Sequence, residues 1–187
     1  MHRRPLLDLL ERYALVHPSE SGVVERMRGF VEAHEDCFER SCLEGHVTGS
    51  AWILSDDHER VLLTHHAKLG RWLQLGGHSD GDPDPFRVAL REAREESGLR
   101  ELLLFDPDGD PFPLDIDIHE IPSRAAEPAH LHYDVRYLLV AAPGQRLVRS
   151  DESRELRWVE RSRLRELSRE RSLLRLEEKA RHRRRPC

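Results

Sequence analysis

The chain has 187 residues, a length typical of one domain with a sizeable core and too short for two full domains. Charged residues make up 35% of it, and the 35 acidic residues outnumber the 30 basic ones, which argues against a dedicated binder of nucleic acid. No run approaches the roughly 20 apolar residues of a membrane span, and acidic residues interrupt the apolar start of the chain, so neither a membrane span nor a secretion signal is expected.

The first 44 residues are predicted to be helical. Leu6 and Leu10 fall on one face of a helix, and a second amphipathic stretch follows over residues 22–34. We expect residues 1–44 to form an N-terminal helical extension ahead of a main domain at 45–181. The amphipathic pattern of the extension fits either a lid over a site or the interface of a homodimer.

From residue 45 onward the sequence changes to short runs rich in β-branched and aromatic residues, which predict strands. The predicted strands cover residues 46–54, 60–65, 99–105, 115–121 and 132–141. Clusters of aspartate, proline and glycine between them supply the turns. A final helix is expected over 161–181, followed by a basic C-terminal tail at 182–187.

One further helix is expected between the second and third of these strands. Asp84 can cap its N-terminus, and Pro85 fits its first turn because the missing N–H needs no partner there. Gly98 supplies its end, and Phe86 and Ala93 belong to a modest apolar stripe that we expect to face a sheet. A strand-rich chain with several packed helices predicts an α+β protein, built as an α/β/α sandwich.

Three glutamates of this helix, Glu92, Glu95 and Glu96, are predicted to share one sector that is turned away from the apolar stripe. Like charges at this spacing cost a helix roughly 0.2–0.5 kcal/mol per pair, a cost that a bound divalent cation would reverse. An isolated cluster of this kind is more often a solvated, charged face. Here it follows a loop with Gly76 and Gly77, where backbone groups can approach a ligand closely, and this combination favours a site.

The loop and the helix together resemble the box of the Nudix hydrolases, Gly-x5-Glu-x7-Arg-Glu-U-x-Glu-Glu-x-Gly-U, in which U is apolar. The matching positions are Gly77, Arg91, Glu92, Ala93, Glu95, Glu96, Gly98 and Leu99. One position departs from the pattern, because Pro83 stands where the family has its first glutamate. Asp80, Asp82 and Asp84 flank Pro83, and our hypothesis is that a shifted carboxylate replaces that glutamate.

The resemblance implies a fold, a reaction and a cofactor. The implied fold is an α/β/α sandwich with a mixed β-sheet, and the implied enzyme is a hydrolase acting on phosphoanhydride bonds. Its reaction would be the divalent-metal-dependent cleavage of the diphosphate in a nucleoside diphosphate linked to another group, with Mg²⁺ or Mn²⁺ as cofactor. The family also uses a further acid between the box and the final helix, for which Glu152 and Glu155 are candidates by their location.

The resemblance also assigns roles within the box. The implied metal ligands are the carbonyl of Gly77 and the carboxylates of Glu92, Glu95 and Glu96, which are hard oxygen donors suited to these cations. Glu92 is expected to act as a ligand or as the general base. Arg91 is expected to belong to the catalytic group by orienting the carboxylates.

Histidines and an arginine near the box are candidates for contacts with the substrate. His130, His132 and Asp134 alternate onto one face of a predicted strand, and His78 follows the glycine pair. We expect His78, His132 and Arg71 to contact the phosphates or the base of a nucleotide-type substrate. The alternatives for the two histidines of the strand are a transition-metal pair or satisfied histidines on a half-exposed face.

Two other interpretations keep the fold and change the function. Pro83 favours a non-catalytic Nudix module that binds a nucleotide or regulates a partner, whereas the complete set of three glutamates favours the enzyme. A prenyl diphosphate isomerase lacks a suitably placed acid, because Cys37 and Cys42 lie in the extension. The three cysteines have neither metal-site nor disulfide spacing, which is typical of a cytoplasmic protein.

Overall fold

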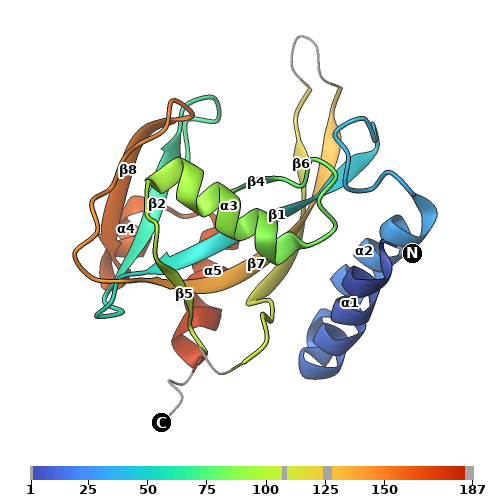
Figure 1. Cartoon of the computed structure of the whole chain (residues 1–187), viewed down its shortest axis with the longest axis horizontal. Helices are drawn as coiled ribbons and strands as arrows, with labels where there is room; N and C mark the ends of the chain where they lie inside the picture. The colour runs from blue at the N-terminus through green and yellow to red at the C-terminus, as the bar shows by residue number, and fades with distance from the viewer. Residues whose placement is uncertain (1, 107–108, 124–127, 184–187) are drawn as a thin grey trace.

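The computed structural model of the chain describes residues 2–106, 109–123 and 128–183 (Figure 1). Its strands are β1 (Gly45–Leu54), β2 (Arg60–His66), β3 (Trp72–Leu73), β4 (Leu75–His78), β5 (Leu102–Leu104), β6 (Asp115–Ile121), β7 (His130–Ala141) and β8 (Ser153–Glu160). In the described part of the chain these eight strands form one sheet with the path β3-β2-β1-β7-β5, to which β4 adds beside β1, β6 beside β7 and β8 beside β2. The sheet is mixed, because β1 and β7 pair in parallel while the other pairs are antiparallel.

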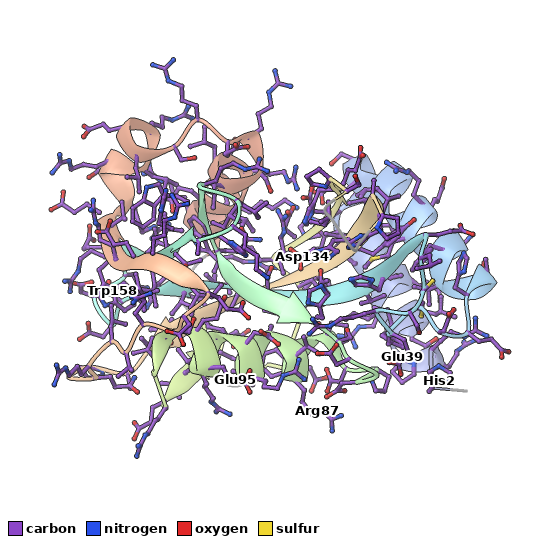
Figure 2. The ribbon with its side chains drawn as sticks, turned by 90° about the horizontal axis from the view of Figure 1, so that it is seen from above. His2, Glu39, Arg87, Glu95, Asp134 and Trp158 are labelled. Carbon is purple, nitrogen blue, oxygen red and sulfur yellow. The ribbon has the colours of Figure 1, made fainter. Side chains whose placement is uncertain are left out.

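Helices lie on both faces of this sheet. The helical elements are α1 (Arg4–Val16), η1 (Pro18–Glu20), α2 (Ser21–Ala33), α3 (Pro85–Ser97), η2 (Arg161–Arg163), α4 (Leu164–Leu167) and α5 (Arg171–His182). Figures 1 and 2 show α3 against one face and α4 and α5 against the other, with α1 and α2 side by side at the end of the sheet near β6. The predicted α/β/α sandwich is confirmed. No helix within the described ranges is long and apolar enough to span a bilayer.

Strand β1 is the centre of the molecule because it is buried along its whole length. Its residues alternate between two cores, as the side-chain period of a strand requires. Val47, Ala51 and Ile53 belong to the cluster that includes the buried face of α3. Trp52 and Leu54 belong to the cluster beneath α5 on the opposite face. Odd-numbered residues of β1 therefore face α3, and even-numbered residues face α5.

The predicted strands agree with the structure where the alternation of their side chains is strong. The predictions are wrong where a segment becomes a strand only by pairing with a distant one. Strand β6 has the predicted bounds exactly, whereas β5 begins at Leu102 and is shorter than predicted. The glycine loop expected before the central helix is in fact strand β4, because residues 75–78 pair antiparallel with β1. The predicted final helix is also broken, since Ser168 has an extended backbone between α4 and α5.

The predicted N-terminal helices are present and share a core with the sheet. Leu10, Met27 and Phe30 are buried in the cluster that also contains Val47 of β1. The ring of Phe30 stacks on Tyr133 of β7 with centroids 3.9 Å apart. These contacts fix the helices to the end of the sheet. The division of the chain at residue 45 stays a prediction, and most of the predicted basic tail lies outside the described residues.

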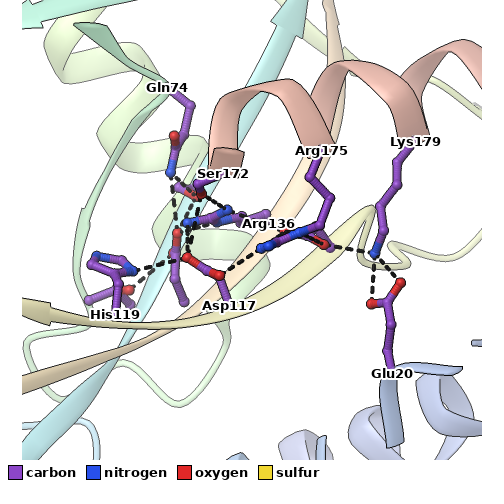
Figure 3. Close-up of polar contacts among 12 residues, drawn as sticks. Glu20, Gln74, Asp117, His119, Arg136, Ser172, Arg175 and Lys179 are labelled. Atoms are coloured by element: carbon purple, nitrogen blue, oxygen red, sulfur yellow. Dashed lines mark hydrogen bonds and ion pairs between the residues drawn. The ribbon is translucent and has the colours of Figure 1, made fainter. Parts of the chain in front are cut away.

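A buried network of charges links the sheet, α5 and the N-terminal helices (Figure 3). Arg136 of β7 is 2% exposed and contacts three aspartates, with Asp134 at 2.7 Å, Asp117 at 2.6 Å and Asp115 at 3.2 Å. Arg175 and Lys179 of α5 hold Asp115 from the other side at 2.8 and 2.7 Å.

Two further contacts extend this network to the N-terminal helices. Lys179 also pairs with Glu20 at 2.6 Å and bonds the hydroxyl of Tyr13 at 2.7 Å. Removing one charged residue of such a group leaves the opposite charges buried without a partner, which is strongly destabilising. The network therefore couples β6, β7, α5 and the N-terminal helices.

We expect Arg136→Met to lower the free energy of unfolding by about 3–5 kcal/mol, because it leaves buried carboxylates without their central cation. Burial opposes ionisation of Asp115, but the hydrogen bond from Arg175 and the charge of Arg136 outweigh it and hold the pKa of Asp115 below its usual range. The stability that this carboxylate contributes is thus present above about pH 4 and is lost as the pH falls further. Urea unfolding should show that the free energy of unfolding of the variant falls less than that of the wild type as the pH is lowered below about 4.

The matched control is Arg163→Met, since Arg163 pairs with Glu166 on the surface and both side chains are about two-thirds exposed. Its effect on the unfolding free energy should stay within about 0.5 kcal/mol. Equal losses in the two variants would show that burial of the arginine contributes nothing.

Candidate functional site

The helix that carries the box glutamates has the predicted caps. The side chain of Asp84 accepts hydrogen bonds from the backbone N–H groups of Phe86 and Arg87 at 3.0 and 3.3 Å. Pro85 occupies the first turn, and Gly98 ends the helix with a φ of 70°, a conformation that glycine adopts without strain. The local sequence therefore fixes where α3 begins and ends.

The three glutamates are not all turned away from the packed face of α3, so this part of the prediction is wrong. Glu96 is only 5% exposed and its Oε2 accepts a hydrogen bond from the N–H of Gly76 in β4 at 3.1 Å. Glu95 is exposed and Glu92 is half-buried. The reason is helical spacing, since Glu96 follows the buried Ala89 and Ala93 by seven and three residues and so lies on the packed face of α3.

Strand β4 and α3 approach each other closely at Gly77. A Cβ atom at this position would overlap the carboxylate of Glu92. Arg91 fixes this carboxylate, because its guanidinium donates to Glu92 Oε1 at 2.8 Å and to the backbone carbonyl of His78 at 2.6 Å. Arg91 thus contacts Glu92, and the backbone of Gly77 lies beside the same carboxylate. The orienting role of Arg91 and the metal-binding role of Gly77 stay predictions.

The glutamates are close enough to perturb one another. Burial raises the pKa of Glu96 to about 8, and the negative charges of Glu92 and Glu152 add to the shift. Burial also raises the pKa of Glu92, although the hydrogen bond from Arg91 opposes the increase. Burial of like charges without a nearby cation is costly. The site therefore concentrates negative charge that a cation would compensate.

Glu152 is the better of the two candidates for a further acid. Its charge acts on both Glu92 and Glu96, although it lies far from them in the sequence. Glu155 instead lies on β8 and accepts a hydrogen bond from Arg157 at 2.7 Å. The turn before β8 thus brings a fourth carboxylate towards the box, whereas the strand itself carries Glu155 elsewhere.

This donor set fits a hard divalent cation. Carboxylate and backbone carbonyl oxygens are the ligands that Mg²⁺ and Mn²⁺ prefer, and the group offers both types around Gly77. With its pKa raised to about 8 by burial, Glu96 is mostly protonated at pH 7, and a bound cation would favour its ionised form. Of the predicted ligands, Glu92 and Glu96 lie against the glycines of β4. Glu95 is exposed on the outer side of α3 (Figure 2).

The hypothesis of a shifted carboxylate near Pro83 is not supported. Asp80 pairs with Arg40 at 2.5 Å, and Asp82 pairs with Arg87 at 2.6 Å. Asp84 is occupied as the N-cap of α3. Each candidate thus has a structural partner of its own.

The sequence did not predict the contacts that hold the turn at residues 80–84. The segment before β1 binds this turn, because the carbonyl of Phe38 accepts a hydrogen bond from the N–H of Gly81 at 3.0 Å and Arg40 pairs with Asp80. Glu39 also lies against Gly81. The link spans some forty residues, and no local pattern in the sequence signals it.

The predicted substrate contacts separate into two places. His78 and His132 come together, with ring centroids 5.0 Å apart. Burial lowers the pKa of His78 to about 4 and that of His132 to about 2, so both rings are neutral at pH 7. Arg71 instead pairs with Glu170 at 3.3 Å in the turn before β3. Its contact with a substrate stays a prediction.

His46 joins His78 and His132 and was not anticipated. Its Nε2 atom lies 3.2 Å from Nε2 of His132, and its ring centroid is 4.9 Å from those of His78 and His130. Because His46 stands opposite His132 in the parallel pairing of β1 and β7, only the register of the sheet reveals this histidine cluster. Asp134, two residues along β7, accepts hydrogen bonds from Thr48, Ser50 and Gln74.

Comparisons with known proteins agree with this geometry. The sequence profile described as the NUDIX domain matches residues 45–178. A NUDIX-family hydrolase from Clostridium perfringens superposes with a TM-score of 0.57 at 24% identity, over 72% of this chain and 95% of the other. A MutT NUDIX hydrolase from Burkholderia pseudomallei has a TM-score of 0.52 at 25% identity, over 71% and 96%. An Ap4A hydrolase from C. elegans has a TM-score of 0.51 at 16% identity, over 72% and 93%. No curated protein matches the sequence.

In protein freed of metal by a chelator at pH 7, Glu96→Gln should raise the free energy of unfolding by about 1–3 kcal/mol, because it removes a carboxyl group that must be protonated on burial but keeps an oxygen for the N–H of Gly76. Adding Mg²⁺ should stabilise the wild type more than this variant. The measurement is the melting temperature with chelator and with Mg²⁺.

Glu11→Gln, at an exposed position of α1, is the control and should behave as the wild type in both conditions. A Glu96→Gln protein that is less stable than the wild type in chelator, and that gains as much from Mg²⁺, would contradict the assignment of Glu96 as a ligand.

Proposed function

The chain belongs to the Nudix family of hydrolases, which act on phosphoanhydride bonds, and from this premise we propose that it is a divalent-metal-dependent pyrophosphohydrolase. Its substrate would be a nucleoside diphosphate linked to another group, cleaved within the diphosphate. The observation that carries this proposal is the buried carboxyl group of Glu96, which lies with Glu92 against the glycines of β4. Such a site costs stability unless a cation and its anionic ligand complete it.

The chemistry needs a cation because the attacked phosphorus is surrounded by negatively charged oxygens. Mg²⁺ or Mn²⁺, when bound, neutralises the diphosphate, lowers the pKa of a bound water and stabilises the leaving phosphate. We assign Glu92, Glu95, Glu96 and the carbonyl of Gly77 to hold it. Because this set includes three carboxylates, it provides more negative charge than one dication carries and leaves capacity for a second ion.

The remaining residues of the site position these donors. The guanidinium of Arg91 bridges the carboxylate of Glu92 and the backbone carbonyl of His78. It fixes Oε1 of Glu92 and does not bind Oε2. Glu92 is therefore the best placed of the three glutamates to accept a proton from an attacking water, because Arg91 leaves its Oε2 available. Glu152 adds a carboxylate from the turn before β8, as a further ligand or as an alternative base.

The class of substrate follows from the family rather than from a pocket. The C. elegans neighbour is an Ap4A hydrolase, so dinucleoside polyphosphates belong in an assay panel with ADP-ribose, nucleotide sugars and nucleoside triphosphates. His78 and His132, neutral at pH 7, would contribute hydrogen bonds rather than charge to a nucleotide. We also propose a cytoplasmic location, in keeping with reduced and buried Cys37 and Cys42.

A second candidate function is a Nudix module that binds a nucleotide without cleaving it. One observation favours it, because Pro83 replaces the first glutamate of the box and the neighbouring aspartates are held by other partners. Calorimetric binding of a nucleotide by protein that shows no turnover with Mg²⁺ or Mn²⁺ would decide for this candidate.

We expect Glu95→Gln and Glu96→Gln each to reduce divalent-dependent turnover by at least about 100-fold, since each removes a charged oxygen that holds the cation. Turnover is measured with the substrate panel in a phosphatase-coupled assay, with Mg²⁺, with Mn²⁺ and with chelator. Unchanged activity in both variants would overturn the proposed site. Circular dichroism confirms that each variant is folded.

The pair Glu152→Gln and Glu155→Gln tests the further acid. Glu152→Gln should lower kcat by about 10–100-fold, because its charge reaches Glu92 and Glu96, whereas Glu155→Gln should leave kcat within about twofold. The opposite ranking of the two variants would show that the fourth carboxylate comes from β8 itself.

A further inference from the structure

We propose that His46, His130 and His132 bind one transition-metal ion of the zinc class, at a site separate from the glutamates of α3. The proposal uses none of the box residues, and it assigns His132 to the ion in place of the nucleotide contact proposed above. These three histidines offer one ligand nitrogen each, and the three nitrogens all lie within 4.8 Å of one another. Their imidazoles come from β1 and β7, the two central strands of the sheet.

The register of the sheet brings the histidines together. His46 is the direct partner of His132 in the parallel β1–β7 ladder, so their side chains share a face. His130 precedes His132 by two residues and lies on that face as well. This face is the one opposite α3, because His46 has the same parity in β1 as Trp52, which packs beneath α5. The glutamates of α3 therefore lie on the other side of the sheet.

The spacing of the ligand atoms suits a tetrahedral ion. Zinc binds imidazole nitrogen at about 2.0–2.1 Å, so two nitrogens at a tetrahedral angle stand about 3.3 Å apart. Nε2 of His46 and Nε2 of His132 lie 3.2 Å apart. An ion between these two nitrogens requires no separation of the strands. The third nitrogen needs only a side-chain adjustment of His130, which is at the start of β7.

His130 is oriented for this role by its backbone neighbour. Its Nδ1 lies 3.0 Å from the carbonyl of Pro128, which can accept only an N–H and so places the ring hydrogen on Nδ1. The Nε2 atom of His130 is then a lone-pair donor, and it is buried without a hydrogen-bond partner among the residues that the structure describes. A ligating histidine typically donates its other N–H to a carbonyl in this way.

The donor atoms distinguish a metal from a phosphate as the ligand. The lone pair on Nε2 of His130 attracts a cation and repels a phosphate oxygen. Neutral imidazole is the form that binds a metal. Imidazole nitrogen suits zinc and related ions, whereas carboxylate oxygen suits Mg²⁺, so the two donor sets select different ions.

His78 lies at the edge of the group and connects it to the other site. Its ring centroid is 4.9 Å from that of His46 and 5.0 Å from that of His132, so its imidazole is the nearest candidate for a fourth ligand. The carbonyl of the same residue accepts the hydrogen bond from Arg91 that holds Glu92. One residue of β4 thus touches both donor sets.

The test is titration of the full-length, metal-free protein with Co²⁺, which replaces zinc and shows strong visible absorption when tetrahedral. We expect the wild type to bind one equivalent with this absorption, and zinc to displace it. His46→Gln and His130→Gln should each weaken Co²⁺ binding by at least about 100-fold. Melting temperatures show whether each variant is folded, and His130 is the safer position because it is only partly buried.

Two controls separate this site from other histidines and from the box. His17→Gln changes a half-buried histidine beside Tyr13 in the N-terminal helices and should leave Co²⁺ binding unchanged. Glu96→Gln should also retain the absorption, whatever its effect on turnover. The proposal is overturned if folded wild type shows no tetrahedral Co²⁺, or if Glu96→Gln abolishes the absorption while His130→Gln retains it.

Discussion

The burial of Arg136 is the constraint on which the arrangement of this molecule depends. A guanidinium that is 2% exposed has to be surrounded by acceptors, and here they come from β6 and from β7 itself. Asp115, one of those acceptors, then requires Arg175 and Lys179, which fixes α5 over this face of the sheet. Lys179 in turn reaches Glu20, so the position of the N-terminal helices depends on the same charges.

The network also determines what the central strands can offer. Asp134 is bound on one side by Arg136 and on the other by Thr48, Ser50 and Gln74, which locks β1, β7 and the segment before β4 in register. With that register fixed, Gly77 is held beside Glu92 on one face and His46 beside His132 on the other. The contacts of Asp134 thus position the residues of both proposed sites, although Asp134 belongs to neither site.

What the sequence could predict was local. The caps of α3 depend on residues within one helix and its flanks, so Asp84 and Gly98 were predicted correctly. The burial of Glu96 was missed although its spacing from Ala89 and Ala93 contained the information, because the charge of a glutamate suggests exposure. Strands β3 and β4 were missed for a different reason: they are defined by their partners in the sheet, and pairing across tens of residues leaves no periodic trace. The same argument applies to His46, whose partner in β7 is 86 residues away.

The separation of donors by the sheet has a chemical consequence. Oxygen ligands gathered on one face and imidazoles on the other do not compete for one ion, because Mg²⁺ binds imidazole poorly and zinc is held more tightly by nitrogen than by a few carboxylates. Both groups nevertheless meet at β4, where Gly76 and Gly77 face the glutamates and His78 joins the imidazoles. An ion among the histidines would restrain the side chain of His78 while its carbonyl holds Arg91, and through Arg91 the orientation of Glu92. The proposed imidazole site would therefore act on the box through the backbone of one strand, without either ion approaching the other.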